Sequence, residues 1–290
     1  MRSYSTHGCQ AEPLAMNPRR ITSVSNPLIK EVASLRGARR RREKGRVLVD
    51  GGRDIRRAIE AGWHVDVLVT CESQADDDLA AAVGPLAAAG SVDWIEVPAA
   101  VHARVAYGES SKPVAVVRPR RYTWDDLLSN PGQPTTIVVL DRVEKPGNIG
   151  AVLRCSDALG ASGVVLSDPV CELYNPNAIR SSTGAIFSLP VIEDTAEAAI
   201  DRMMHVGLSL FAARVESAAE DYAAVDWPSR SGIIFGSEAY GLGDRWRVDD
   251  VRGIVIPMAG HVDSLNVSIA AAVVLAEIGC RRRGVHRPER

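Results

Sequence analysis

The sequence predicts an α/β protein with two domains. Its 290 residues are enough for two domains of ordinary size. Short runs rich in Val, Ile and Leu alternate with helical patterns in two blocks, and a polar segment containing Pro131, Gly132 and Pro134 separates the blocks. We therefore expect a smaller domain over residues 17–121, a linker over 122–134 and a second domain over 135–283.

The first block opens with a helix and a basic run. In SNPLIKEVASL the apolar residues recur at helical spacing. Over residues 36–46 every charged residue except Glu43 is basic, and the run includes Arg39, Arg40, Arg41 and Arg42. Such a run is commonly a solvated helix face, but its single sign beside a folded domain is also typical of phosphate binding. Both interpretations stay open here.

The rest of the first block alternates between strand and helix patterns. This alternation predicts a small sandwich with a largely parallel sheet. The expected strands are 47–50, 65–70, 92–97 and 114–117, and the expected helices are 53–61, 76–89 and 99–107.

The second block continues the alternation. The expected strands are 136–140, 163–167, 187–191, 208–212, 232–235 and 253–256. The expected helices are 149–159, 175–181, 195–205 and 266–279, the last being an Ala-rich apolar run too long for a strand. The order of elements alone would fit an ordinary doubly wound parallel sheet.

Three junctions in the second block combine small and polar residues. They are N-x-G-x-x-x-R from Asn148 to Arg154, GSEAYGL from Gly236 to Leu242, and IPMAGHVDSLNVS from Ile256 to Ser268. Glycines at such junctions let the backbone approach a ligand closely. Ser264 and Asn266 also stand where a helix N-cap is expected, so their side chains either cap the last helix or hold a ligand.

With these three motifs in order within one segment, the sequence resembles the SpoU (TrmH-like) family of RNA 2′-O-ribose methyltransferases. The resemblance covers about residues 135–283. The earlier block resembles, more loosely, the L30e-like RNA-binding domain that often precedes such catalytic domains. The resemblance implies a C-terminal SPOUT-type parallel sheet with a deep trefoil knot, preceded by a smaller L30e-like α/β domain. It also implies a homodimer formed through the knotted domain.

The resemblance further implies S-adenosylmethionine as methyl donor. No Gly-x-Gly-x-x-Gly nucleotide fingerprint is present. Backbone near five positions would hold the donor instead: Gly236, Gly241, Ile256, Ser264 and Leu265.

Five catalytic residues are implied as well. Arg154 would be the catalytic arginine, either accepting the proton of the ribose 2′-hydroxyl or holding a phosphate while stabilising the developing alkoxide. Asn148 and Asn266 would orient the reactants, Ser264 would offer a hydroxyl partner, and Glu238 would anchor Arg154 or a neighbouring loop.

Six residues are expected to bind RNA: Arg39, Arg40, Arg41, Arg42, Lys145 and Arg180. Lys145-Pro146 departs from the Asp-Pro that is commoner in the family, and this departure leaves a different target open. For Arg180 a structural salt bridge is the alternative. The net charge of −2 does not favour nucleic acid overall, so RNA would have to meet a local basic patch.

The expected target is ribosomal RNA, most specifically 23S, because an appended L30e-like domain suits a folded RNA element. Transfer RNA is the alternative substrate, and a non-catalytic RNA-binding relative is the alternative class. Scattered cysteines without C-x-x-C spacing and histidines without ligand-spaced pairs indicate a reducing compartment and no metal. With no apolar run of membrane-span length, we expect a cytoplasmic protein that does not associate with membranes.

Overall fold

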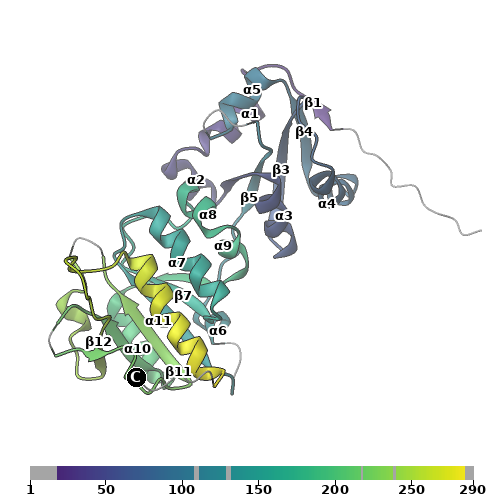
Figure 1. Cartoon of the computed structure of the whole chain (residues 1–290). Coiled ribbons are helices and arrows are strands. Elements are labelled where there is room, and N and C mark those ends of the chain that lie inside the picture. The colour runs from purple at the N-terminus through teal and green to yellow at the C-terminus, as the bar shows by residue number, and fades with distance from the viewer. Residues whose placement is uncertain (1–17, 108–110, 129–131, 217, 238–239, 285–290) are drawn as a thin grey trace, which may run out of the picture.

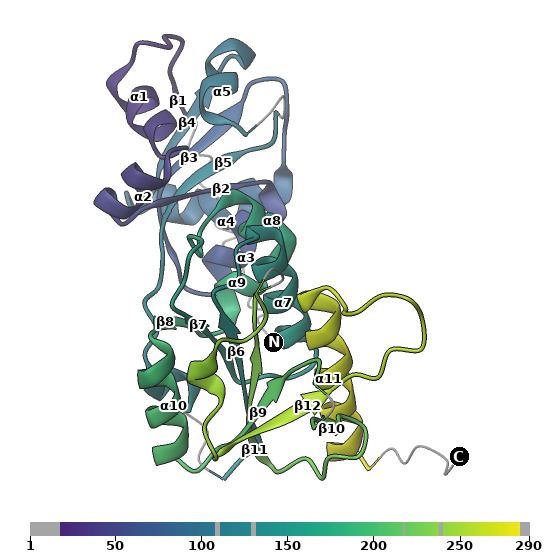
Figure 2. The same cartoon turned by 90° about the vertical axis from the view of Figure 1, so that its left-hand side faces the viewer.

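A computed structural model describes residues 18–107, 111–128, 132–216, 218–237 and 240–284. Two sheets lie toward opposite ends of an elongated molecule, and short helices fill the junction between them (Figures 1 and 2). No helix in these ranges is long and apolar enough to span a membrane.

The N-terminal sheet has the order β1-β4-β3-β5-β2. Its strands are β1 (Arg19–Arg20), β2 (Val47–Asp50), β3 (His64–Cys71), β4 (Asp93–Val97) and β5 (Val114–Arg118). β4 runs parallel to β1 and β3, whereas β5 runs antiparallel to β2 and β3. Four of the five strands thus run in the same direction, so the prediction of a largely parallel sheet holds except at β5, which is reversed. The seven-residue helix before β5 spans only about 10 Å.

Helices cover both faces of this sheet. They are α1 (Pro27–Ser34), α2 (Ala38–Lys44), α3 (Gly52–Glu60), α4 (Asp77–Ala88) and α5 (Ala99–Val105). α1 and α5 enclose one core with Leu48, Val69 and Ile95. α3 and α4 cover the other face through Ile55 and Leu79.

The C-terminal sheet has the order β10-β12-β9-β11-β6-β7-β8, and every neighbouring pair is parallel. The strands are β6 (Thr135–Asp141), β7 (Gly163–Ser167), β8 (Val191–Asp194), β9 (Ser209–Ala213), β10 (Glu220–Asp221), β11 (Arg230–Phe235) and β12 (Val251–Val255). The predicted α/β class, with a parallel C-terminal sheet after a smaller α/β domain, is confirmed. The trefoil knot stays a prediction.

Side chains of the central strand β6 alternate between two cores, as the pleat requires. Val138 and Leu140 face α7 (Pro146–Ala158) and α11 (Val267–Arg282), which lie side by side in both views. Ile137 and Val139 face α10 (Ala196–His205) and the short α6 (Trp124–Leu127). The remaining elements are α8 (Pro176–Ser182), α9 (Ala185–Ser188) and the 3-10 turn η1 (Asp244–Trp246).

Two segments differ from their predicted form. The strand expected at 187–191 begins only at Val191, because Phe187 belongs to α9 and Pro190 has no N–H for a strand ladder. The segment expected to be a linker contains α6, which is stabilised by a Thr123–Asp126 capping box and buries Leu127 in the core of the C-terminal domain.

The two domains share one continuous apolar core. Trp63, after α3, packs edge-on against Phe187 with ring centroids 5.1 Å apart and against Tyr174 at 5.6 Å. Its indole N–H donates to the Phe187 carbonyl at 3.0 Å, and the Tyr122 hydroxyl donates to the same oxygen at 3.2 Å. Because large aromatic rings interlock across the junction, we expect the N-terminal domain to keep a fixed position on the C-terminal domain.

Candidate active site

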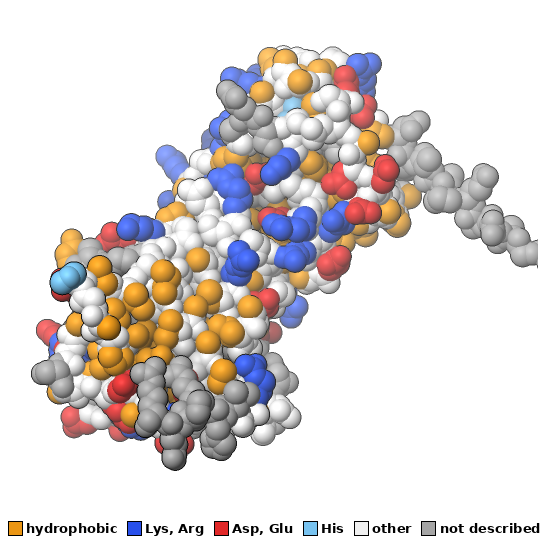
Figure 3. All heavy atoms as spheres, viewed as in Figure 1, with side chains coloured by type: hydrophobic (Ala, Val, Ile, Leu, Met, Phe, Trp, Pro, Cys, Tyr) orange, Lys and Arg blue, Asp and Glu red, His pale blue; other side chains and the backbone are white. Residues whose placement is uncertain are grey.

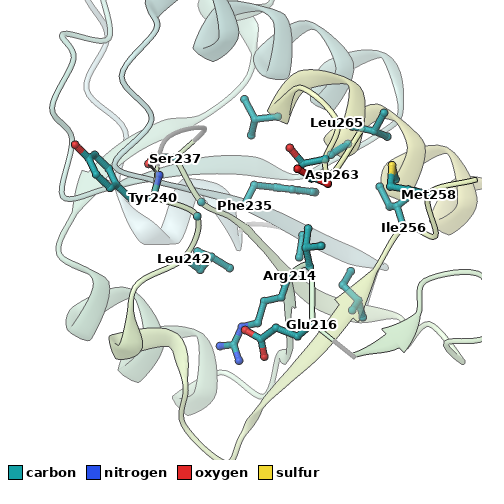
Figure 4. Close-up of a pocket in the computed structure, with 18 of the residues that line it drawn as sticks. Arg214, Glu216, Phe235, Ser237, Tyr240, Leu242, Ile256, Met258, Asp263 and Leu265 are labelled. Carbon is teal, nitrogen blue, oxygen red and sulfur yellow. Dashed lines mark hydrogen bonds between the residues drawn. The ribbon is translucent and has the colours of Figure 1, made fainter. Parts of the chain in front are cut away.

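A cleft of about 460 Å³ opens where β9, β11 and β12 end, and these strands are neighbours in the order β12-β9-β11. Open parallel sheets place ligand sites at this carboxyl edge. The lining comes from the loops after these three strands and from the first turn of α11 (Figure 4). The size is that of a small-molecule site. We call this cavity the donor cleft.

The sequence motifs converge on the donor cleft. All five residues predicted to hold the methyl donor belong to its lining: Gly236, Gly241, Ile256, Ser264 and Leu265. Their contact with a donor stays a prediction, but their convergence on one cavity is a property of the fold.

Gly236 is a glycine because the loop after β11 folds back over it. A Cβ at Gly236 would lie 2.3 Å from the carbonyl carbon of Gly241 and 2.5 Å from the amide nitrogen of Leu242. Ser237 closes this turn, since its carbonyl accepts from the Gly241 N–H at 2.9 Å and its Oγ from the Tyr240 N–H at 3.1 Å. Glu238, predicted to be catalytic, lies outside the described residues.

The structure adds lining residues that sequence analysis missed. Arg214 and Glu216 follow β9 and lie at the same end of the donor cleft, whereas Tyr240 points away from it (Figure 4). Desolvation lowers the pKa of Arg214, whose guanidinium donates to the Trp246 carbonyl. A hydrogen bond from Arg247 lowers the pKa of Glu216. Their position just after a parallel strand was the feature of the sequence that could have indicated Arg214 and Glu216 as lining residues.

Asn266 has the predicted role of a helix cap, and its contact with a ligand stays a prediction. It is the N-cap of α11, and its Oδ1 accepts from the Ser268 N–H at 2.9 Å. Its amide nitrogen donates to Asn148 Oδ1, in the first turn of α7, at 3.2 Å. Asn266 therefore caps one helix while tying it to the next. Ser264, two residues earlier, is exposed at the donor cleft.

Arg154 lies elsewhere. It is exposed on α7 and lines a second cavity, of about 500 Å³, between the two domains. Arg57 of α3 and Gly184, before α9, line the same cavity, which we call the junction cleft. Among the described residues that line the donor cleft, Arg154 is absent. Within one chain, the structure thus brings Asn148, Asn266 and the donor loops together but leaves Arg154 on a separate cleft.

Four of the six predicted RNA-binding residues have exposed side chains, whereas Arg180 and Arg41 contact the rest of the protein. Arg39, Arg40 and Arg42 are exposed on α2, and Lys145 is exposed just before α7. Arg39 and Arg40 both pair with Glu43 on the same helix.

The Arg180 side chain is partly exposed but contacts three other residues of the protein. Its Nη1 lies 3.6 Å from the Asp50 carboxylate, its Nη2 donates to Asn177 Oδ1 at 2.7 Å, and its guanidinium lies over the Tyr107 ring. These contacts fit the alternative of a structural salt bridge across the domain junction.

Arg41 requires a correction. Its side chain is only 3% exposed and binds Glu172 of the catalytic domain through two hydrogen bonds, at 2.8 and 2.6 Å. It also donates to the carbonyls of Leu35 and Arg36. Glu172 raises the pKa of Arg41. The prediction that Arg41 binds RNA is wrong, because the helix turns this one arginine inward to join the two domains.

The comparisons with known proteins agree with this geometry. The model of the SpoU rRNA Methylase family matches residues 135–276, and that of the MRM3-like substrate binding domain matches residues 26–116. The 23S rRNA (uridine(2479)-2′-O)-methyltransferase of Streptomyces viridochromogenes is 31% identical over 267 residues, which cover 89% of this chain and 91% of that protein. The chain belongs to the SpoU rRNA methylase family.

Solved structures of methyltransferases superpose on about nine tenths of the chain. The SpoU methyltransferase AviRb from S. viridochromogenes, in complex with AdoMet, matches with a TM-score of 0.78 and 28% identity over 90% of this chain and all of that chain. An AdoMet-bound rRNA methyltransferase from Sinorhizobium meliloti matches with a TM-score of 0.79 and 27% identity over 91% of this chain and 98% of that chain. Both matches extend over the N-terminal and the C-terminal domain of this chain.

The described residues contain no group of three or more His, Cys, Asp and Glu side chains placed to hold a metal ion.

Proposed function

We propose that this SpoU enzyme methylates a ribose 2′-hydroxyl of ribosomal RNA with S-adenosylmethionine. The observation that carries the proposal is that the second and third SpoU motifs meet in the donor cleft, while the Asn266–Asn148 hydrogen bond joins the first motif to them. AviRb and the S. meliloti enzyme, which share both domains with this chain, are AdoMet-bound.

The residues present fit this donor. A side chain at Gly236 would collide with the Gly241 backbone, so the loop stays thin and backbone lines the cavity. Phe235, Ile256 and Leu265 offer apolar surface for an adenine ring, and Glu216 offers a carboxylate that accepts hydrogen bonds from sugar hydroxyls. When bound, S-adenosylmethionine supplies an electrophilic methyl group on a sulfonium.

The ribose oxygen must then be positioned, and its proton must pass to an acceptor. Asn148 and Asn266 lie beside the donor loops, so their amides are placed to orient the attacking sugar. Arg154 either accepts the proton itself or holds the RNA phosphate and stabilises the developing alkoxide while water accepts the proton.

The separation of Arg154 from the donor cleft supports a homodimer that completes the site. Hydrophobic side chains gather on the face where α7 and α11 lie (Figure 3), and Ile269 of α11 is 52% exposed. An exposed apolar face of this kind is typical of an interface between subunits. We infer that a second copy covers it and brings its Arg154 to the donor cleft. Sedimentation measurements that find only monomers during catalysis would contradict this.

Calorimetry and methyl transfer test the proposal together. We expect S-adenosylmethionine to bind without RNA or added metal, S-adenosylhomocysteine to compete, and a chelator to leave activity unchanged. Labelled methyl groups should enter ribosomal RNA prepared from cells that lack the gene, and cell fractionation should find the protein in the cytoplasm. Labelling of transfer RNA alone would favour the alternative substrate, and donor binding without transfer to either RNA would indicate a non-catalytic relative.

A further inference from the structure

The junction cleft is built by both domains. On one side stands α3 of the N-terminal domain, and on the other stand α7 and the turn between α8 and α9. Arg57 and Arg154 are its two cationic side chains, one from each domain. Lys and Arg side chains form a band on this face, over the region where these helices meet (Figures 1 and 3).

Both guanidinium groups are available for a ligand. Neither Arg57 nor Arg154 forms an ion pair with a carboxylate of the described residues, although other α3 arginines do. Arg53 pairs with Asp54 at 3.2 Å, and Arg56 pairs with Asp78 at 3.0 Å. Two unpaired guanidinium groups that face one cavity favour an anion, and arginine is well suited to phosphate.

The cleft also contains two carboxylates. Asp157 accepts a hydrogen bond from the Ser188 hydroxyl at 3.4 Å, and Glu60 is exposed in the last turn of α3. The cleft is therefore not uniformly basic, and an anion must bind at the position where the two arginines face it.

Gly184 is what lets Arg57 reach the cleft. Its φ of +97° lies in the left-handed region, and a Cβ there would be 2.3 Å from Arg57 Cδ and 2.7 Å from Arg57 Nη1. The arginine side chain thus lies directly over the glycine backbone. The Trp63–Phe187 contact anchors α3 on α9, so Arg57 is held in place relative to Arg154.

We propose that Arg57 and Arg154 together clamp one phosphodiester of the RNA next to the ribose that is methylated. The N-terminal domain then contributes a substrate-positioning residue to the active site, in addition to any contact it makes with distant parts of the RNA. This inference rests on the proposed function, since it uses Arg154 as the residue beside the target ribose.

The test compares Arg57→Gln with Arg56→Gln, its matched control on the same helix. Arg56 is paired with Asp78 and is not part of the junction cleft lining. The full chain is assayed on ribosomal RNA from cells that lack the gene. Arg57→Gln should lower kcat/KM for this RNA at least about tenfold, the scale of one charged hydrogen bond. It should also reduce the log–log salt slope of RNA binding by about one. Calorimetric affinity for S-adenosylmethionine and the unfolding temperature should not change.

Further measurements distinguish failure of the proposed clamp from failure of the proposed function. Arg57→Lys, which keeps the charge, should recover part of the RNA affinity and the salt slope but not the full rate. If Arg57→Gln matches Arg56→Gln in rate and salt slope while the parent enzyme methylates RNA, the clamp is overturned and the function stands. If the parent enzyme transfers no methyl group to any RNA, the proposed function fails first.

Discussion

At the scale of single residues, the SpoU motifs require glycine at different positions for different physical reasons. Gly236 is needed because a loop that lines the donor cleft crosses it closely. Gly150 is needed because α8 packs on α7 there: a Cβ would lie 2.3 Å from the Ala178 carbonyl oxygen and 2.8 Å from Ser181 Cβ. The sequence interpretation, in which every motif glycine admits a ligand, is wrong for Gly150. A pattern of small residues does not distinguish a ligand from a neighbouring helix.

Arg154 gives the sharpest prediction at this scale. Because it should act mainly on the transition state, Arg154→Ala should slow single-turnover methylation by at least about a hundredfold, the scale of one lost acid–base or oxyanion group. Binding of S-adenosylmethionine should change far less, since both roles proposed for Arg154 act on the ribose and its phosphate rather than on the donor. A near-parental rate with RNA fully bound would remove Arg154 from the mechanism.

Arg154→Lys separates the two roles left open for this residue. Lysine keeps the positive charge, loses the planar fork and has an ordinary pKa of about 10.4. If the side chain accepts the ribose proton, the rate should rise as the pH approaches that value. If it clamps a phosphate with two hydrogen bonds, the variant should stay impaired at every pH. The exposed position of Arg154 beside Arg57 favours the clamp.

At the scale of helices and strands, the apolar patterns predicted five of the seven strands of the C-terminal sheet, misplaced β8 and missed the two-residue β10. β7 and α11 were predicted because a continuous apolar run bounded by turn residues has few other solutions. The patterns could not predict that β5 runs antiparallel, that α2 turns one arginine inward, or that Arg214 follows β9 into the donor cleft. These features depend on tertiary contacts, which local spacing does not record.

The Arg41–Glu172 pair should contribute strongly to stability. Removing one partner of a buried ion pair leaves an uncompensated charge, which costs about 3–5 kcal/mol. We therefore expect Glu172→Gln or Arg41→Ala to lower the unfolding free energy by about that amount in urea titrations. Arg39→Ala is the matched control, because its side chain is 88% exposed and a surface pair contributes about 0–1 kcal/mol. Equal losses in Arg41→Ala and Arg39→Ala would show that the buried pair does not hold the domains together.

At the scale of the whole molecule, two domains that the sequence separates share one core. The motifs predict the donor cleft from the sequence alone, since its glycines and the S-L-N segment follow strands of a parallel sheet. Nothing in local spacing indicates the junction cleft, because Arg57 and Arg154 are far apart in the chain and line one cavity only once the domains pack together, as through Trp63 on Phe187. The junction cleft is thus a property of the domain arrangement.

Ribose methylation should be mapped across total RNA from cells with and without the gene. We expect one or a few 2′-O-methyl sites in ribosomal RNA that disappear with the gene and return with the parent chain but not with Arg154→Ala. Identical ribose methylation in both cell lines, under conditions where the protein is made, would contradict it.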